Sequence, residues 1–247
     1  MAAPAPASDP AVVAAQLMAD VWPQIEAATQ GKPPVFPRQL VWLNGAPGAG
    51  KGTNTRTIMQ VLAIEQQPVV VSDLLSSPEF IKIKNSGALV GDKDVVGLLL
   101  KKLLDPAYVA GAIVDGFPRS RAQAEFLRLL VAKLESLAAA HPGVCAKPSL
   151  RVIVLNVAEE VAVERQIKRG REAVMSNELA RKLGGRVEDI RATDVDPASA
   201  AKRFRVFQEQ TVGALQSLTN AFPCHFIDAG ADIPTVRASI EKALGAG

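Results

Sequence analysis

The chain has 247 residues, of which 48% are hydrophobic, 21% charged and 4% aromatic, and its formal net charge at pH 7 is +3. This composition is typical of a globular protein, and so small a net charge excludes the broad basic field that nucleic acid would require. We therefore expect one sizeable α/β domain whose basic chemistry is confined to a local site.

The cysteines and the N-terminal region indicate the compartment. Cys145 and Cys224 lie far apart without a CxxC pair, which is typical of a reducing compartment and argues against a zinc site. No charge-free apolar run is long enough to span a bilayer, and residues 1–30 lack the basic and apolar regions of a signal peptide. We expect a cytoplasmic monomer that binds neither a membrane nor nucleic acid.

Residues 1–37 are predicted to form a flexible tail and a docking helix that precede the main domain, 38–247. The start is rich in Ala and Pro, and apolar residues then recur at four-residue spacing, at Val13, Leu17, Val21 and Ile25. Pro23 lies inside this pattern and is expected to interrupt it, so a single helix over 10–30 is not favoured.

Five short apolar runs alternate with longer helical patterns after Arg38. They cover residues 39–44, 68–72, 112–115, 150–157 and 224–228. Runs that are apolar at nearly every position are typical of strands covered on both faces, as in a parallel sheet with helical crossovers. The sequence therefore predicts a five-stranded parallel sheet with helices on both faces. In such a sheet the ligand lies beyond the carboxyl ends of the strands.

A glycine-rich loop follows the first of these runs. It reads Gly45-Ala46-Pro47-Gly48-Ala49-Gly50-Lys51-Gly52-Thr53, and a helical pattern comes next. Strand, loop and helix form the context of a phosphate-binding loop, because backbone N–H groups and a helix N-terminus then surround the phosphate oxygens. Lys51 can reach the β- and γ-phosphates. Gly52 displaces the threonine of the strict motif by one position, and a glycine-rich turn without function is the disfavoured alternative.

A second motif ends the run 112–115. Asp115 is followed by Gly116, Phe117, Pro118 and Arg119, with Gln123 four residues further on. A carboxylate that faces a phosphate loop can hold Mg²⁺ through its water shell, and an arginine can fork onto a phosphate. The Gln123 amide could read a base edge. Taken alone, the DGFP string could also be only a turn.

Arginines cluster after the fourth run. Arg165 and Arg169 lie four residues apart and so share one helix face, and Arg191 and Arg203 bracket the start of a later helix. A single arginine is more often a surface residue. The cluster favours phosphoryl transfer, in which positioning and positive charge do most of the work.

The loop GxPGxGKGT and the string DGFPR-x-x-Q together resemble the adenylate kinases, and the resemblance extends over residues 39 to 244. It implies a P-loop kinase fold with an acceptor-nucleotide arm at 73–104 and a lid insert at 170–190. It also implies reversible, Mg²⁺-dependent transfer of a phosphoryl group from ATP to a nucleoside monophosphate, with AMP as the expected acceptor and two ADP as the products.

The resemblance gives each motif residue a role. The implied catalytic residues are Lys51, Arg119, Arg169, Arg191 and Arg203. The implied ATP-binding residues are Gly45, Ala46, Pro47, Gly48, Ala49, Gly50, Lys51, Gly52, Thr53 and Arg165. The acceptor nucleotide would meet Ser72, Asp73, Val90, Gly116, Arg119 and Gln123, and water molecules on Mg²⁺ would meet Asp115 and Thr53.

The chain departs from the family pattern in two places. Ser76 stands where the family usually has an arginine, and Lys82 or Lys84 could replace that arginine or be solvated. The lid segment has no cysteines and is predicted to form a helix, a Gly-Gly break and a second helix. A UMP/CMP kinase remains an alternative, as does a nucleotide-binding regulatory module without transfer activity.

Overall fold

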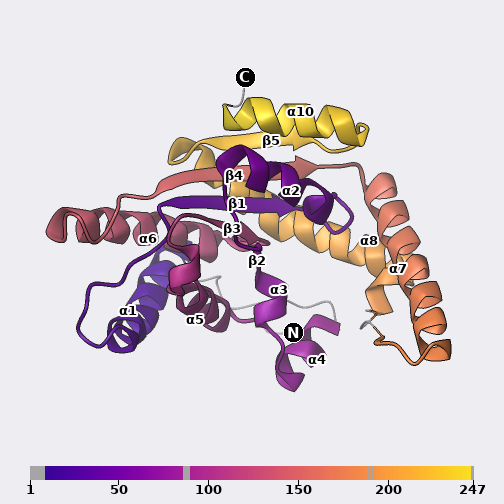
Figure 1. The fold of residues 1–247 in the computed structure, drawn as a ribbon, viewed down its shortest axis with the longest axis horizontal. Coiled ribbons are helices and arrows are strands. Elements are labelled where there is room, and N and C mark those ends of the chain that lie inside the picture. The colour runs from indigo at the N-terminus through magenta and orange to yellow at the C-terminus, as the bar shows by residue number, and fades with distance from the viewer. Residues whose placement is uncertain (1–8, 86–89, 188–189, 191, 246–247) are drawn as a thin grey trace, which may run out of the picture.

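A five-stranded parallel sheet lies at the centre of residues 9–85, 90–187, 190 and 192–245, the part of the chain described by the structure, a computed structural model. The strands are β1 (Gln39–Gly45), β2 (Val69–Val70), β3 (Ala112–Asp115), β4 (Ser149–Asn156) and β5 (Cys224–Asp228). Their order across the sheet is β2-β3-β1-β4-β5, so the first strand in the chain occupies the middle (Figure 1). This arrangement confirms the predicted fold class.

Helices cover both faces of the sheet. The long ones are α1 (Pro10–Ala28), α2 (Lys51–Leu62), α5 (Asp92–Leu103), α6 (Arg121–Ala140), α7 (Glu159–Lys182), α8 (Pro197–Val206) and α10 (Ile233–Leu244). Shorter segments are α3 (Val71–Leu74), α4 (Pro78–Asn85), α9 (Gly213–Ser217), a π-helical turn η3 (Phe207–Val212) and the 3₁₀ turns η1 (Pro106–Tyr108), η2 (Ala192–Asp194) and η4 (Leu218–Asn220). No helix within the described ranges combines the length and the apolar character needed to cross a membrane.

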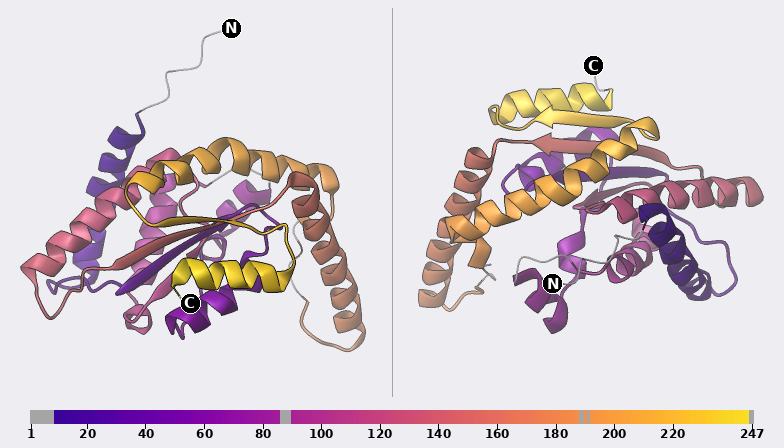
Figure 2. Two further views of the ribbon diagram at one scale, coloured as in Figure 1. Left: turned by 90° about the horizontal axis from the view of Figure 1, so that it is seen from above. Right: turned by 180° about the vertical axis from the view of Figure 1, so that it is seen from behind.

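The alternation of side chains along β1 divides the core into two layers. Leu40 and Trp42 are buried on one face, with apolar residues of α1, α5, α6 and α9. Val41 and Leu43 are buried on the other face, with apolar residues of α2 and α10. Figure 2 shows α6 and the segment η3–α9, which follows α8, lying over the first of these faces. Burial on both faces explains why the strands read as nearly continuous apolar runs.

The helix α1 runs through Pro23 without a break, so the expected interruption is wrong. The side chain of Asp9 caps its start by accepting a hydrogen bond from the backbone N–H of Ala11 at 2.9 Å. Leu17, Val21 and Ile25 on its apolar face are buried in the core that α5 and α6 share. This packing stabilises the helix by more than the loss of one hydrogen bond at an exposed proline costs.

Two further segments differ from the sequence-based expectation. The run 68–72 forms only a two-residue strand at the sheet edge, where Val69 and Val70 pair with Val114 and Asp115, and the chain enters α3 at Val71. Val71 is buried in the core as a helical residue, and an apolar run alone cannot distinguish these two environments. After α7, the described residues 185–187 and 190 are not helical, so the second lid helix is absent from them.

Candidate active site

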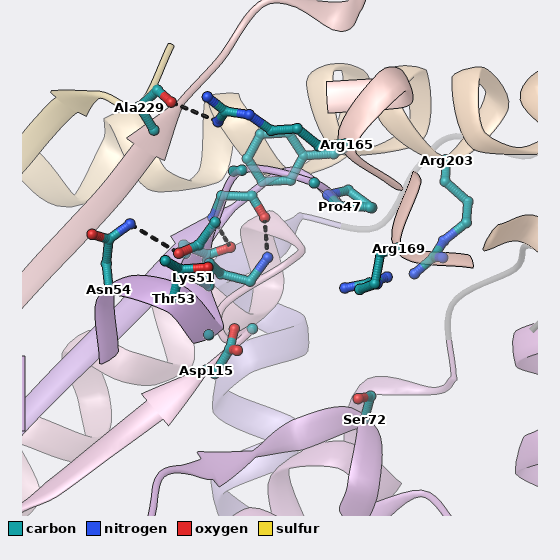
Figure 3. Close-up of a pocket in the computed structure, with 18 of the residues that line it drawn as sticks. Pro47, Lys51, Thr53, Asn54, Ser72, Asp115, Arg165, Arg169, Arg203 and Ala229 are labelled. Atoms are coloured by element: carbon teal, nitrogen blue, oxygen red, sulfur yellow. Dashed lines mark hydrogen bonds between the residues drawn. The ribbon is translucent and has the colours of Figure 1, made fainter. Parts of the chain in front are cut away.

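A cavity of about 870 Å³ opens at the carboxyl ends of β1 and β3, the edge at which the parallel sheet predicts a ligand. Its wall combines the phosphate loop, the start of α3, the loop after β3, and side chains of α7, α8 and the β5–α10 connection (Figure 3). A volume of this size is typical of a site for a small molecule of nucleotide dimensions. The cavity therefore brings together motifs that lie far apart in the sequence.

The phosphate loop depends on glycine for its shape. Gly48 has a φ of +84°, and a Cβ atom placed there would overlap the backbone carbonyl group of Ala162 at the start of α7. Only glycine fits this position without strain. The helix α2 begins directly at Lys51, so its first N–H groups face the cavity, and their free donors and the helix dipole favour an anion.

Lys51 lies at the centre of this loop. Its Nζ atom donates to the carbonyl oxygens of Gly45 at 2.8 Å and Ala46 at 3.2 Å. Burial lowers the pKa of Lys51 to about 8; Asp115 opposes the shift, and the guanidinium groups of Arg119, Arg203 and Arg169 add to it. A bound anion would favour the charged form and counteract this shift. The acidic groups of the site therefore do not fully balance the positive charge of Lys51.

Asp115 lies opposite Lys51 at the end of β3 (Figure 3). Burial raises the pKa of this carboxyl group, while Lys51 and Arg119 partly offset the shift and Asp73 adds to it. Thr53 and Asp73 also line the cavity. Oxygen atoms suited to the water shell of a hard cation therefore face the same space as the phosphate loop.

Arginines from α7 and α8 line the same cavity. Figure 3 shows Arg169 and Arg203 directed toward the same space, whereas Arg165 is turned toward Ala229. The Arg165 Nη1 atom donates to the carbonyl oxygen of Ala229 at 2.7 Å. Arg169 and Arg203 both pair with Asp194, at 3.1 Å and 3.2 Å. A half-buried carboxylate therefore fixes the spacing of two guanidinium groups.

The turn η2 that carries Asp194 is pressed against α7. A Cβ atom at Gly170 would overlap the carbonyl group of Asp194, so the two backbones meet at a glycine. Next to it, the buried Gln166 donates from Nε2 to the carbonyl oxygen of Thr193 at 2.6 Å. The Thr193 hydroxyl in turn accepts from Arg203 Nη1 at 2.9 Å. These contacts join α7, η2 and α8 into one arginine-bearing assembly.

The loop after β3 holds Arg119 through its backbone as well as its side chain. The guanidinium Nε of Arg119 donates to the carbonyl oxygen of Gly116 at 2.8 Å, and its backbone N–H donates to Gln123 Oε1 at 2.7 Å. The Gln123 Nε2 atom donates to Asp92 at 2.7 Å. The Gln123 side chain is therefore engaged at both ends of its amide, and it is buried away from the cavity wall.

The structure places most of the predicted site residues at one cavity. The predicted residues that line it are Gly45, Pro47, Gly48, Ala49, Gly50, Lys51, Gly52, Thr53, Ser72, Asp73, Asp115, Gly116, Arg119, Arg165, Arg169 and Arg203. Ala46, Val90 and Gln123 are buried close by but are not part of the wall. Arg191 lies outside the described residues.

Sequence reasoning missed a part of the wall that carries no motif. These residues are Asn44, Asn54, Val70, Thr193, Asp194, Val206, Phe207, Thr211, Ala229, Ala231, Ile233 and Val236. For the last four, the only available signal was that they follow β5, whose carboxyl end meets the same sheet edge.

Comparisons with known proteins give one family model and several proteins named adenylate kinase. The profile of the family described as "AAA domain" matches residues 44–180. A Beijerinckia indica protein named adenylate kinase is 33% identical over 214 residues, which are 83% of this chain and 98% of that protein. Adenylate kinase of Bartonella bacilliformis is 33% identical, with 82% and 97% covered, and that of Gloeobacter violaceus is 40% identical, with 52% and 56% covered.

Proposed function

The chain belongs to the adenylate kinase family, and on that premise we propose that it transfers the terminal phosphoryl group of ATP to AMP, giving two ADP. The bond between the γ-phosphorus and the β-phosphate oxygen breaks, and a bond forms between that phosphorus and an oxygen of AMP. The observation that carries the proposal is the convergence of Lys51, Arg119, Arg169 and Arg203 on one cavity.

The cationic groups divide the work along the cavity. Lys51 and the N–H groups of the loop suit the β- and γ-phosphates of the donor. Arg169 and Arg203, spaced by Asp194, suit the equatorial oxygens of the group in transit, where charge is spread in the transition state. Arg119, which lines the same cavity, suits the acceptor phosphate. We retain Arg191 as a further predicted cation on this path.

The donor base fits the apolar end of the cavity. Ala229, Ala231, Ile233 and Val236 provide a weakly polar wall beside Arg165. A planar guanidinium can stack on an aromatic base, and small aliphatic residues leave room for one. We propose that the adenine of ATP lies between Arg165 and this wall.

Mg²⁺ is the cofactor that accompanies ATP in this proposal. The carboxylate of Asp115 and the hydroxyl of Thr53 are hard oxygen groups within the phosphate end of the cavity, and Mg²⁺ usually keeps several waters when it binds phosphates. When bound, the ion would neutralise part of the negative charge on the phosphates of ATP. Asp115 would orient its water shell.

The acceptor end is lined by Val70, Ser72 and Asp73 together with Gly116 and Arg119. We propose residues 73–104 as the acceptor arm and 170–190 as the lid, whose closure would keep water from competing with the acceptor. Val90 and Gln123 remain predicted contacts of the acceptor base. The UMP/CMP kinase alternative differs at this end alone, and Ser76 is the one departure there. A cytoplasmic location and a monomeric state also stay predictions.

The deciding experiment is phosphoryl transfer from Mg·ATP to AMP, CMP, UMP and GMP, each at equal concentration, with a control that lacks acceptor. Fast ADP formation with AMP alone is the expected result. A preference for CMP or UMP would move the chain to the pyrimidine enzymes. Nucleotide binding without transfer to any acceptor would favour the regulatory module.

A further inference from the structure

The carbonyl oxygen of Arg119 accepts a hydrogen bond from a side chain in a distant part of the chain. Thr211 Oγ1 donates to it at 3.0 Å, across 92 positions of sequence. Thr211 is almost fully buried and lines the cavity. A hydroxyl bonded to the main chain of Arg119 restrains the peptide from which the guanidinium projects, without occupying the space that a phosphate would take.

The preceding carbonyl group, that of Pro118, also accepts a hydrogen bond from a distant side chain. Asn44, buried at the end of β1, donates from Nδ2 to the carbonyl oxygen of Pro118 at 2.9 Å. Its Oδ1 atom accepts the backbone N–H of Gly45 at 3.3 Å, at the first residue of the phosphate loop. The consecutive carbonyl groups of Pro118 and Arg119 are therefore held by side chains from β1 and η3.

A π-helical turn between α8 and α9 places Thr211 beside Arg119. Residues Phe207–Val212 form a π-helical turn between α8 and α9. In a regular α-helix Thr211 would lie about 80° around the axis from Arg203, which is eight residues earlier. A π turn takes up about one extra residue, or about 100°, so Thr211 returns to within about 20° of Arg203. Both side chains then face the cavity.

We propose that Thr211 is a positioning residue that fixes Arg119 relative to Arg203. The inference rests on the proposed function, because it gives Arg119 the acceptor phosphate as its ligand. The π turn makes one helix carry both a cation for the group in transit and a restraint on the acceptor cation. The distance between the two guanidinium groups is thereby set by a single rigid element.

The test compares substitutions that remove or keep the hydroxyl. Thr211→Val and Thr211→Ala remove the bond to Arg119, Thr211→Ser keeps it, and Thr57→Val makes the same atomic change at a buried threonine of α2 outside the cavity wall. We expect kcat/KM for AMP to fall about tenfold in the first two variants, with KM for ATP changed less than twofold, because the restraint acts on orientation. Thr211→Ser and Thr57→Val should match the unmodified protein.

Equilibrium binding of AMP by calorimetry, in the absence of ATP, gives a second readout that needs no turnover. The AMP Kd should rise in Thr211→Val and Thr211→Ala and return to its original value in Thr211→Ser. Equal losses for ATP and AMP, equal losses in Thr211→Ser, or unchanged values in Thr211→Val and Thr211→Ala would each overturn the inference. If the unmodified protein transferred to no acceptor, the proposed function would fail, while the AMP Kd series would still decide the role of Thr211.

Discussion

The two ends of the cavity are built on different physical foundations. At the donor end, the loop 45–50 is shaped by backbone conformation, and Gly48 cannot carry any side chain beside Ala162. At the acceptor end, Arg119 is placed by two hydrogen bonds of its backbone: its N–H donates to Gln123 Oε1, and its carbonyl oxygen accepts from the Thr211 hydroxyl. The donor end should therefore tolerate almost no substitution, whereas the acceptor end should respond to each contact by a graded change.

The charge distribution follows the same division. Lys51, Arg169 and Arg203 line the donor end; burial is the main cause of the lowered pKa of Lys51, and the positive charges of Arg119, Arg203 and Arg169 add to it. The acceptor end has Ser76 where the family pattern has an arginine. A polyphosphate should thus be held by many contacts and a monophosphate by few, so the two KM values should be separable by mutation.

The largest effect is expected from Lys51→Ala. Turnover should fall by about a thousandfold or more, because no other side chain can follow the β- and γ-phosphates from within the loop. Steady-state kinetics measures the loss. Thermal unfolding should show a fold that is still intact, and Lys242→Ala, at an exposed lysine of α10 outside the cavity wall, is the matched control. Activity retained in Lys51→Ala would show that the donor end is not where the phosphates bind.

Removing the Asp194 carboxylate, which pairs with Arg169 and Arg203, should lower activity less than Lys51→Ala does. Asp194→Ala releases Arg169 and Arg203 from their common partner, so both guanidinium groups must be ordered by the nucleotide itself. We expect kcat to fall by about ten- to a hundredfold, with a smaller change in ATP affinity. Asp196→Ala, at the helix cap two residues further along, provides a control for local unfolding. Equal losses in the two variants would mean that Asp194 acts only on the stability of this turn.

The pH dependence of ATP binding should report on Lys51 alone. With a pKa of about 8 in the protein, Lys51 is charged below this pH and loses its proton above it. Binding of a polyanion then requires proton uptake, so the Kd for ATP should rise by up to about tenfold per pH unit above pH 8. Calorimetry at pH 7 to 9.5 measures this rise. Lys51→Arg should abolish it, since a guanidinium does not titrate in this range.

The same shift has a consequence for folding stability with the opposite sense. The charged form of Lys51 is disfavoured in the folded protein below pH 8, and that cost is relieved as the pH rises from about 8 toward the ordinary lysine value of 10.5. The contribution of this residue to the free energy of unfolding should therefore grow over the interval in which ATP affinity declines. Denaturant titrations of the unmodified protein and of Lys51→Arg separate this contribution from the rest.

The smallest effect is expected at Ser76. Introducing the family residue by Ser76→Arg should lower KM for the monophosphate a few-fold and leave KM for ATP unchanged, because one exposed charge adds a modest, salt-screened attraction. Kinetics at low and high ionic strength tests both statements. Ser77→Arg, one residue further, controls for a general increase in positive charge. An equal effect on the two substrates would contradict the division of the cavity into independent ends.

The sequence predicts the central elements of the fold because their patterns are local. Residues 39–45, 112–115 and 224–228 combine dense apolar content with motif or turn residues at their ends, and the glycine loop is a continuous string. The failures at Pro23 and at Val71 have a tertiary origin. Burial against α5 and α6 decides whether a proline is tolerated and whether a valine run is strand or helix.

The candidate site divides in the same manner. The spacing of sequence motifs predicts Lys51, Arg119 and the arginines of α7 as site residues. Thr211 and the part of the wall after β5 belong to no motif. Thr211 becomes a cavity residue only because a π turn changes the helix phase, and a regular 3.6-residue periodicity assigns it to a different face. Knowledge of the sheet edge gives the location of such residues but not their identities.

The glycine contact between α7 and η2 bears on how the proposed lid, residues 170–190, would move. Because the backbones at Gly170 and Asp194 touch, we expect the first half of α7 and the arginines paired with Asp194 to move together. A swing of the outer half of α7 must bend the helix beyond Gly170, or else carry Arg169 and Asp194 with it. Opening of the proposed lid for product release would then also move Arg169 away from the transferred phosphoryl group.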